Sequence, residues 1–191
     1  MIKIKCPLIL ASGSPRRKDI LQTMGLNFTI DVSDADEDFT GAPDETVMEL
    51  SLRKAKAVAP KHEDAYVLAA DTLVYNGALL GKPGSYEKSI EMLRALRGQW
   101  HSVFTGITLI HHRSGNVIQR ACETRIHFVD MTDEDIHAYV MTGEPLDKAG
   151  AYAIQGLGGM FIDRIEGSYS NAVGLPMADV REMICEMNEL V

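Results

Sequence analysis

Short apolar runs alternate along the chain with stretches in which apolar residues recur at helical spacing. Apolar runs bounded by turn residues are typical of buried strands, and recurrence every three to four residues is typical of helices. The runs predict strands at residues 8–11, 28–32, 66–75, 101–112, 117–129 and 160–165. The helical spacing predicts helices at residues 15–24, 44–58, 85–96 and 132–142, and a last one from 176. Turn signals at residues 76–77 and 114–116 predict hairpins, so the pattern indicates a mixed α/β fold with antiparallel parts.

Several helix ends carry their own signals. Gly25 is placed to stop the first helix, and Ala59-Pro60 is placed to close the second. Thr46 and Glu49 have the spacing of a capping box at the start of the second helix. The last helix is expected to bury one face, made of Met177, Val180, Ile184 and Met187.

Length and composition fit one ordinary globular domain. The 191 residues predict a single domain spanning 1–191, or one domain with a lobe, and 46% hydrophobic residues supply enough material for a core. The 24% charged residues, together with that apolar share, exclude disordered, collagen-like and coiled-coil classes. The net charge of −8 makes the chain a poor generic binder of nucleic acid, although it can bind a small anion where basic residues gather.

Cysteine usage and the N-terminus predict a cytoplasmic protein. Cys6, Cys122 and Cys185 are odd in number and widely separated, so we expect reduced thiols rather than a disulfide framework or a metal site. The first residues lack the long apolar stretch of a signal peptide. No run approaches the ~20 apolar residues of a spanning helix, so no membrane association is expected.

The first candidate site is the basic run at residues 12–18, between a predicted buried strand and a predicted helix start. A helix N-terminus offers free N–H groups and the positive end of the helix dipole, which suits phosphate. Arg16, Arg17 and Lys18 oppose that dipole, at ~0.3–1 kcal/mol each when exposed. An anionic ligand would reverse the sign of this penalty. The alternative is a solvated basic helix start.

The second candidate site is Asp71-Thr72, which interrupts an apolar run. A carboxylate in a buried strand is unfavourable unless it is paired, bound to metal or protonated. Such a group is a candidate general base or metal ligand. The alternative is an aspartate at a strand end or bulge that faces water.

Other polar groups are weaker candidates. The acidic residues of segment 31–38, among them Glu37, are typical of a solvated loop, but beside a phosphate site they could supply an oxygen ligand to Mg²⁺. Lys54 and Lys82 are two of several lysines that could neutralise a triphosphate locally. The zinc-protease, nucleophile-elbow and Walker-type phosphate-loop motifs are absent from the sequence.

Four ordered segments together resemble the Maf family of nucleoside triphosphate pyrophosphatases. They are LASGSPRR at 10–17, AADT at 69–72 with GKP at 81–83, LDKAGAYAIQG at 146–156, and GSY at 167–169 with GLP at 174–176. The resemblance spans residues 8–176 and implies an elongated α/β domain. Its mixed, twisted sheet would be flanked by helices, with a deep cleft between two lobes, as in the related inosine triphosphate pyrophosphatases.

The resemblance also implies a reaction and roles for residues. The reaction is hydrolysis of a nucleoside triphosphate between the α and β phosphates, with a divalent metal (Mg²⁺ or Mn²⁺). Asp71 matches the proton acceptor, and Arg16, Thr72 and Gln155 match positions that set base specificity. The polar residues that match the phosphate and metal region are Ser12, Arg17, Lys54, Lys82 and, as the candidate metal ligand, Glu37.

The segment around Gln155 is similar to the branch of the family that acts on dTTP and UTP. The branch that acts on 7-methyl-GTP usually lacks its tyrosine and glutamine, here Tyr152 and Gln155. Ala153 stands where many members have glycine, and its methyl group could narrow the base pocket. The resemblance further implies a homodimer that binds a small nucleotide, and a role in keeping unwanted nucleotides out of nucleic acids.

Two alternative functions remain open. One is a non-catalytic, nucleotide-sensing regulator of cell division. The other is a pyrophosphatase for a different base, such as 7-methylguanine, or for modified pyrimidines. A nucleic-acid-binding domain is disfavoured by the charge of −8.

Overall fold

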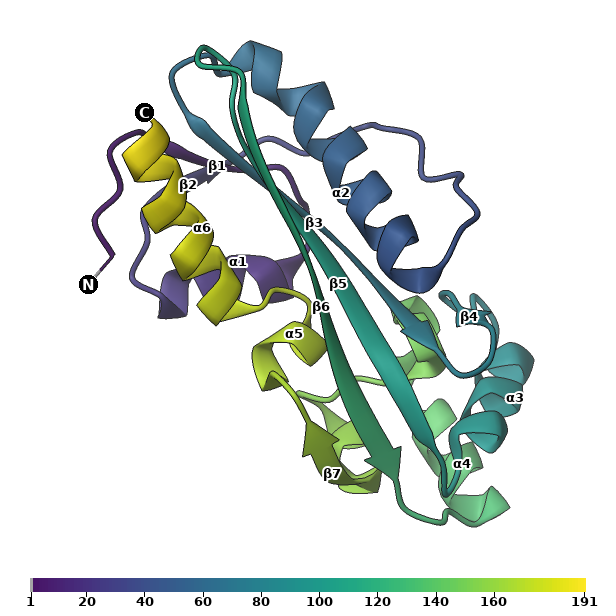
Figure 1. Ribbon diagram of the computed structural model, residues 1–191. Coiled ribbons are helices and arrows are strands. Elements are labelled where there is room, and N and C mark those ends of the chain that lie inside the picture. The colour runs from purple at the N-terminus through teal and green to yellow at the C-terminus, as the bar shows by residue number, and fades with distance from the viewer. Residues whose placement is uncertain (1) are drawn as a thin grey trace. The chain divides into compact units, whose positions relative to one another are not determined.

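The computed structural model describes residues 2–191 and contains helices and strands in mixed order (Figure 1). The strands are β1 (Leu8–Leu10), β2 (Phe28–Ile30), β3 (Tyr66–Tyr75), β4 (Leu79–Leu80), β5 (Trp100–His111), β6 (Asn116–Phe128) and β7 (Ile162–Glu166). The α-helices are α1 (Pro15–Thr23), α2 (Pro43–Val58), α3 (Tyr86–Leu96), α4 (Asp133–Val140), α5 (Tyr169–Val173) and α6 (Met177–Leu190). No helix within residues 2–191 combines the length and apolar character needed to span a membrane.

Most predicted elements are confirmed, with corrections at their ends. The capping box placed at Thr46 and Glu49 is wrong, because Pro43 already starts α2 and the Glu45 carboxylate accepts the Ala42 N–H at 3.4 Å. Glu49 instead pairs with Arg53 one turn later, at 2.8 Å.

Three further corrections concern short segments. The strand expected from residue 160 begins at Ile162, because Leu157–Phe161 form a 3-10 turn. Met177 is only half-buried at the first position of α6, and Met183 joins the buried face instead. The short helix α5 had no counterpart among the predicted elements.

The strands form one mixed sheet in the order β2-β1-β3-β5-β6-β7, with β4 paired to β3. β1 runs parallel to β2 and to β3, whereas β3–β4 and β6–β7 are antiparallel. The prediction of a mixed sheet flanked by helices is therefore confirmed. The deep cleft stays a prediction.

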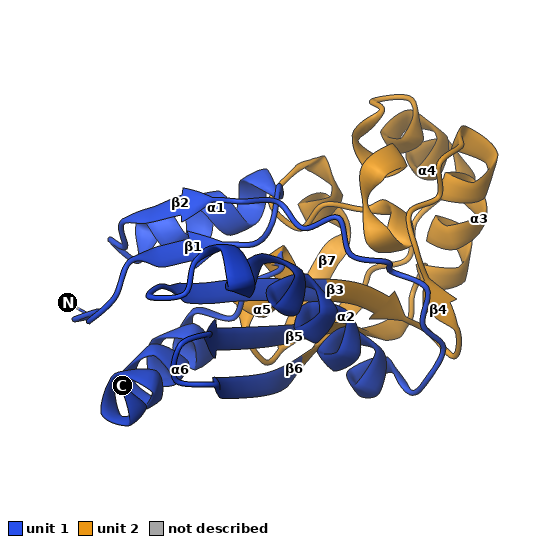
Figure 2. Ribbon diagram, turned by 90° about the horizontal axis from the view of Figure 1, so that it is seen from above, with its two compact units in different colours: residues 1–71, 105–122, 174–191 blue, residues 72–104, 123–173 orange. Residues whose placement is uncertain are grey.

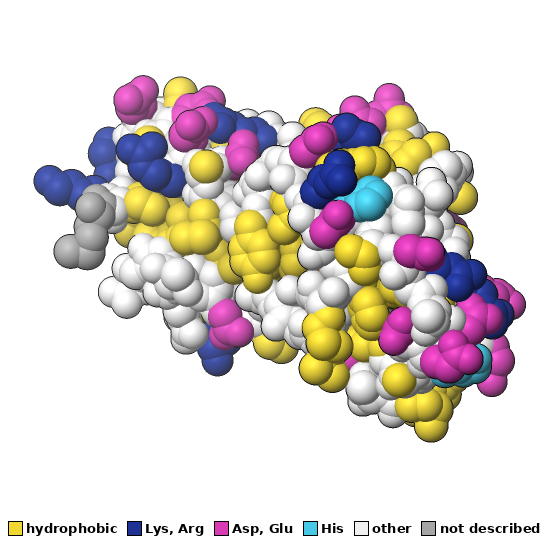
Figure 3. Space-filling model, turned by 90° about the horizontal axis from the view of Figure 1, so that it is seen from below, with side chains coloured by type: hydrophobic (Ala, Val, Ile, Leu, Met, Phe, Trp, Pro, Cys, Tyr) yellow, Lys and Arg dark blue, Asp and Glu magenta, His cyan; other side chains and the backbone are white. Residues whose placement is uncertain are grey.

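The chain is divided into two compact units, coloured separately in Figure 2. Unit 1 comprises residues 1–71, 105–122 and 174–191, and unit 2 comprises residues 72–104 and 123–173. The long strands β3, β5 and β6 each contribute residues to both units. Hydrophobic side chains reach the surface between charged ones, as the space-filling view shows (Figure 3).

In unit 1, α2 packs against β1, β3 and the second half of β5. Its small residues Ala55 and Val58 share a buried cluster with Ile9, Val67 and Ile110. A polar contact lies among these apolar residues: the hydroxyls of Ser51 and Thr108, both fully buried, are hydrogen-bonded at 2.8 Å.

The approach of α2 to the sheet is closest at Gly106 of β5. A Cβ atom on Gly106 would overlap the carbonyl of Val47 and would lie 2.7 Å from the backbone nitrogen of Met48. Because real Cβ atoms do not come this near to backbone, only glycine allows the observed distance between strand and helix. This contact sets the distance between α2 and the sheet. The same helix carries Lys54.

In unit 2, α3 and α4 lie side by side (Figures 1 and 2) and cover apolar residues of β5 and β6. Leu93, Ile126 and Ile136 are fully buried in this core. It also holds a cluster of rings, in which Phe128 packs edge-on against His101 and Tyr152 with ring centroids 5.0 and 4.8 Å away. Tyr152 thereby anchors the glycine-rich segment, residues 150–159.

Candidate active site

Lys54 joins two carboxylates in unit 1. Its Nζ lies 2.6 Å from Asp71 Oδ1 and 2.7 Å from Glu37 Oε1. The Lys54 and Asp71 side chains are 13% and 14% exposed, whereas Glu37 is 66% exposed. The Lys54–Asp71 pair is therefore largely shielded from water, whereas Glu37 contacts Lys54 from the solvent side.

The strand β3 explains why Asp71 stands there. Residues 66–70 are all buried, and Asp71 is the first position of β3 where burial relaxes. The lysine from the neighbouring helix offsets the loss of water around the carboxylate. Of the three conditions expected for a carboxylate in this apolar run (a charged partner, a metal or a proton), the structure shows the charged partner.

The start of α1 supplies further polar and charged groups to the cluster formed by Glu37, Lys54 and Asp71. Ser12 is buried just after β1, and its Oγ accepts a hydrogen bond from Arg17 Nη1 at 3.0 Å. Arg17 Nε donates to the Gly174 carbonyl at 2.9 Å, so the guanidinium is held from two sides. The helix begins at Pro15, and the side chain of its N-cap residue, Ser14, makes no capping hydrogen bond to the first turn. The first-turn N–H groups therefore lack the usual side-chain cap.

Electrostatics link this guanidinium to the carboxylates. Burial lowers the pKa of Arg17 from its ordinary value of 12.5, and the charge of Asp71 opposes this effect. Arg16 lowers the pKa further and Glu37 raises it. Arg16, Glu37 and Asp71 are therefore each close enough to Arg17 for their charges to act on it.

The structure brings most of the sequence-predicted site residues into unit 1. They are Ser12, Arg16, Arg17, Glu37, Lys54 and Asp71. The other three belong to unit 2: Thr72 follows Asp71 directly in β3, Lys82 is exposed after β4, and Gln155 is exposed in the glycine-rich segment.

The carboxylates of Glu37 and Asp71 are the groups in unit 1 that fit a divalent cation. Mg²⁺ is typically held by one or two carboxylates together with substrate phosphate oxygens. Glu37 and Asp71, which both contact Lys54, could supply those one or two carboxylates. Within residues 2–191 no group of three His, Cys, Asp or Glu side chains is arranged to hold a metal by itself.

Sequence reasoning missed two sets of contacts. The Gly174 carbonyl, which orients Arg17, is a backbone group, and no side-chain pattern signals it. Tyr139 and Glu144 make hydrogen bonds to the segment around Gln155. The glycines at 156 and 158 were the available signal for that pair, since both are sites where a backbone approaches other groups closely.

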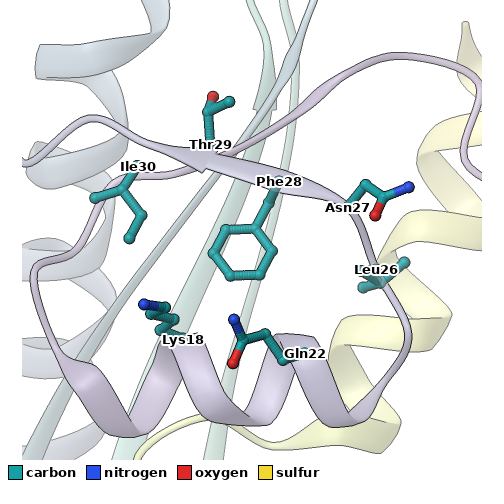
Figure 4. Close-up of a pocket in the computed structure, with 7 residues that line it drawn as sticks. All are labelled: Lys18, Gln22, Leu26, Asn27, Phe28, Thr29 and Ile30. Atoms are coloured by element: carbon teal, nitrogen blue, oxygen red, sulfur yellow. The ribbon is translucent and has the colours of Figure 1, made fainter.

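A separate open pocket of about 510 Å³ lies between α1 and residues 26–30, which include β2 (Figure 4). The Phe28 ring points toward Lys18 and Gln22, whereas Thr29 points away from them. Lys18 lines this pocket, whereas none of the residues assigned to catalysis, phosphate, base or metal does. The pocket is therefore distinct from the charged cluster in unit 1.

Comparison with protein families finds one that matches nearly the whole chain. The family described as Maf-like protein matches residues 7–187. A Halalkalibacterium halodurans protein named dTTP/UTP pyrophosphatase is 49% identical over 175 residues, which is 90% of this chain and 91% of that protein. A Geobacillus protein of the same name is 46% identical over 180 residues, covering 92% of this chain and 96% of its own length.

Solved structures support the fold. The Ham1 protein of Staphylococcus aureus matches with a TM-score of 0.55 at 15% identity, over 95% of this chain and 99% of that one. The HAM1 protein of Coxiella burnetii matches with a TM-score of 0.53 at 14% identity, with the same coverage of both chains. At these identities the likeness concerns the arrangement of helices and strands alone.

Proposed function

The chain belongs to the Maf family, and from that premise we propose that it hydrolyses dTTP and UTP to the monophosphate and pyrophosphate. The relatives at 46–49% identity over at least nine-tenths of this chain carry the name dTTP/UTP pyrophosphatase. The observation in the structure that supports this proposal best is the contact between Lys54 and Asp71 beside the arginine-bearing start of α1.

The cations of unit 1 suit a polyphosphate. Arg17 is held by Ser12 and Gly174, so its planar fork is oriented before substrate binds. Guanidinium and ammonium groups form charge-assisted hydrogen bonds to phosphate oxygens. We assign Arg17, Ser12, Lys54 and Lys82 to the triphosphate.

In the proposed reaction Asp71 is the general base. A water oxygen attacks the α phosphorus, the bond from that phosphorus to the α–β bridging oxygen breaks, and pyrophosphate leaves with the electron pair. Asp71 takes the proton from the attacking water. Arg17 and Lys54 stabilise the negative charge that develops on the leaving group.

A divalent metal, Mg²⁺ or Mn²⁺, fits this chemistry with Glu37 and Asp71 as its protein ligands. When bound, it would neutralise phosphate charge and polarise the α phosphorus. Lys54 already holds both carboxylates, so it keeps them together before the cation and the nucleotide arrive.

We assign recognition of the substrate's nucleobase to Arg16, Thr72 and Gln155. A glutamine amide offers one acceptor and two donors, which suits the O4 and N3 edge of uracil or thymine. Gln155 is exposed, as a residue that meets an incoming base must be.

The test is a product analysis with the purified protein, UTP and Mg²⁺ in water enriched in heavy oxygen. We expect UMP and pyrophosphate, with the heavy oxygen in UMP, because attack is at the α phosphorus. Heavy oxygen in pyrophosphate, or release of inorganic phosphate, would overturn the proposed bond cleavage.

The same assay separates the alternatives. A protein that binds UTP without producing pyrophosphate would be a nucleotide sensor. Faster hydrolysis of 7-methyl-GTP or of a 5-methylated pyrimidine triphosphate than of UTP or dTTP would reassign the substrate. A homodimeric assembly and a cytoplasmic location stay predictions.

A further inference from the structure

A partly buried hydrogen-bond network in unit 2 holds the segment that carries Gln155. The Glu144 carboxylate accepts the Gly158 N–H at 3.0 Å through Oε1 and the Leu157 N–H at 3.0 Å through Oε2. Glu144 Oε1 also accepts the Tyr139 hydroxyl at 2.8 Å. One carboxylate therefore binds two successive backbone N–H groups and a tyrosine.

Tyr139 extends the network to the other end of the segment. Its hydroxyl oxygen accepts the Ala153 N–H at 3.1 Å, and the residue is only 3% exposed. The ring packs against Phe161, with ring centroids 5.4 Å apart. The Glu144–Tyr139 pair thus ties down Ala153 on one side of Gln155 and Leu157 and Gly158 on the other.

Gly156 and Gly158 leave no room for a side chain beside Glu144 and Tyr139. A Cβ atom on Gly156 would overlap the Glu144 carboxylate. A Cβ atom on Gly158 would lie 2.6 Å from the Tyr139 hydroxyl oxygen and 2.9 Å from the Ala153 carbonyl oxygen. Close backbone approach at both positions therefore depends on the absence of a side chain.

The protonation states agree with these donor and acceptor roles. Burial raises the pKa of Glu144, but the hydrogen bonds from Gly158, Tyr139 and Leu157 outweigh it, so the pKa lies below its ordinary value of 4.5. Burial and the neighbouring carboxylate raise the pKa of Tyr139. At neutral pH Glu144 is ionised and Tyr139 keeps its proton.

We propose that Glu144 and Tyr139 are positioning residues, which fix the segment 153–158 so that the Gln155 amide is presented to the pyrimidine base in one orientation. This inference rests on the proposed function, because it takes Gln155 as a base-binding residue. It adds two residues to base selection that do not themselves contact substrate.

Kinetics of Glu144→Gln and Tyr139→Phe test the effect on the substrate. Both variants keep the size of the side chain. Glutamine cannot accept every N–H that the carboxylate accepts, because one end of its amide is a donor. We expect the KM for UTP to rise by about tenfold, with kcat nearly unchanged, because each variant loses a hydrogen bond to the segment. The preference for UTP over CTP should fall in both variants.

Amide hydrogen exchange tests the segment directly, without substrate. Exchange at Leu157 and Gly158 should accelerate by about tenfold or more in Glu144→Gln, because their acceptor is weakened. Exchange at Ala153 should accelerate in Tyr139→Phe. The matched controls are Glu134→Gln and Tyr86→Phe, which alter exposed residues of the same unit and should change neither exchange nor kinetics.

The possible outcomes separate this inference from the proposed function. Unchanged exchange at Leu157 and Gly158 in Glu144→Gln would overturn the inference alone, and so would faster exchange with unaltered KM and unaltered UTP preference. A wild-type protein that leaves UTP intact would overturn the proposed function and, with it, the role in base selection. Less than additive effects in the double variant would support the pair acting as one unit.

Discussion

The ammonium of Lys54 lies 2.6 Å from the carboxylate of Asp71, with less than a sixth of either side chain exposed. Helix α2 supplies the cation and strand β3 the anion, and both belong to unit 1. Because the pair is largely shielded, its members depend on each other for stability as well as for chemistry.

Replacing Asp71 by Asn should remove turnover and leave the fold intact. Asparagine is nearly the same size but cannot accept a proton from water at neutral pH, so kcat for UTP should fall by about 10²–10⁴-fold. Steady-state kinetics and circular dichroism measure the two effects. Asp64→Asn, at an exposed aspartate of the same unit, is the control. Near wild-type turnover in Asp71→Asn would remove Asp71 from the role of general base.

Replacing Lys54 by Met should reduce stability and activity together. The Asp71 carboxylate would stay shielded without its partner, and the free energy of unfolding should fall by about 1–3 kcal/mol. Urea denaturation measures the change. Lys56→Met is the matched control, because Lys56 is exposed on the same helix. An equal loss of unfolding free energy in both variants would show that the Lys54–Asp71 pair contributes no more to stability than an exposed lysine does.

Replacing Glu37 by Gln should weaken the response to Mg²⁺. The concentration that gives half-maximal activity should rise by about tenfold, since one carboxylate ligand loses its charge. Asp34→Asn, an exposed change nearby in the same acidic segment, should leave the titration unaltered. A Glu37→Gln protein with the wild-type Mg²⁺ dependence would exclude Glu37 as a ligand.

The buried His101 should make stability depend on pH. Burial lowers its pKa from 6.5 to about 4, with a smaller contribution from His127, and its Nε2 is hydrogen-bonded to the Tyr152 hydroxyl at 2.8 Å. The unfolded chain then binds a proton more readily than the native protein between these pH values. The stabilisation is complete above pH 6.5 and is lost as the pH falls toward 4.

The loss should amount to about 2–3 kcal/mol over that range, and His101→Gln should flatten it because glutamine does not titrate. Urea denaturation at a series of pH values gives both curves. Identical slopes in wild type and variant would assign the pH dependence to other groups.

Local patterns sufficed for much of the fold and for part of the site. Asp71 was a candidate because one charge in an apolar strand needs a partner, and Lys54 is that partner. The capping box of α2 was misplaced because the helix starts at Pro43 and Glu45, rather than Glu49, reaches back to the N-cap residue. Sequence spacing shows which residues share a helix face, but not which backbone carbonyl a side chain reaches.

The Glu144–Tyr139 pair shows why the side chains that contact a glycine-rich segment could not be identified from the sequence, although the glycines at 156 and 158 signalled a close approach. Tyr139 follows the apolar spacing of α4 and is indistinguishable there from a core residue. Glu144 lies in a short turn, where glutamates are usually solvated. Their partners are backbone N–H groups of residues 153–158, which no side-chain pattern specifies.

Gly106 has an effect that reaches beyond its own strand. Val47, whose carbonyl a methyl group at position 106 would strike, precedes Lys54 by two helical turns on the same side of α2. Alanine at position 106 would push α2 away from the sheet. The distance between Lys54 and Asp71 would then increase. A hydrogen atom in place of a methyl group thus keeps the lysine within reach of its aspartate.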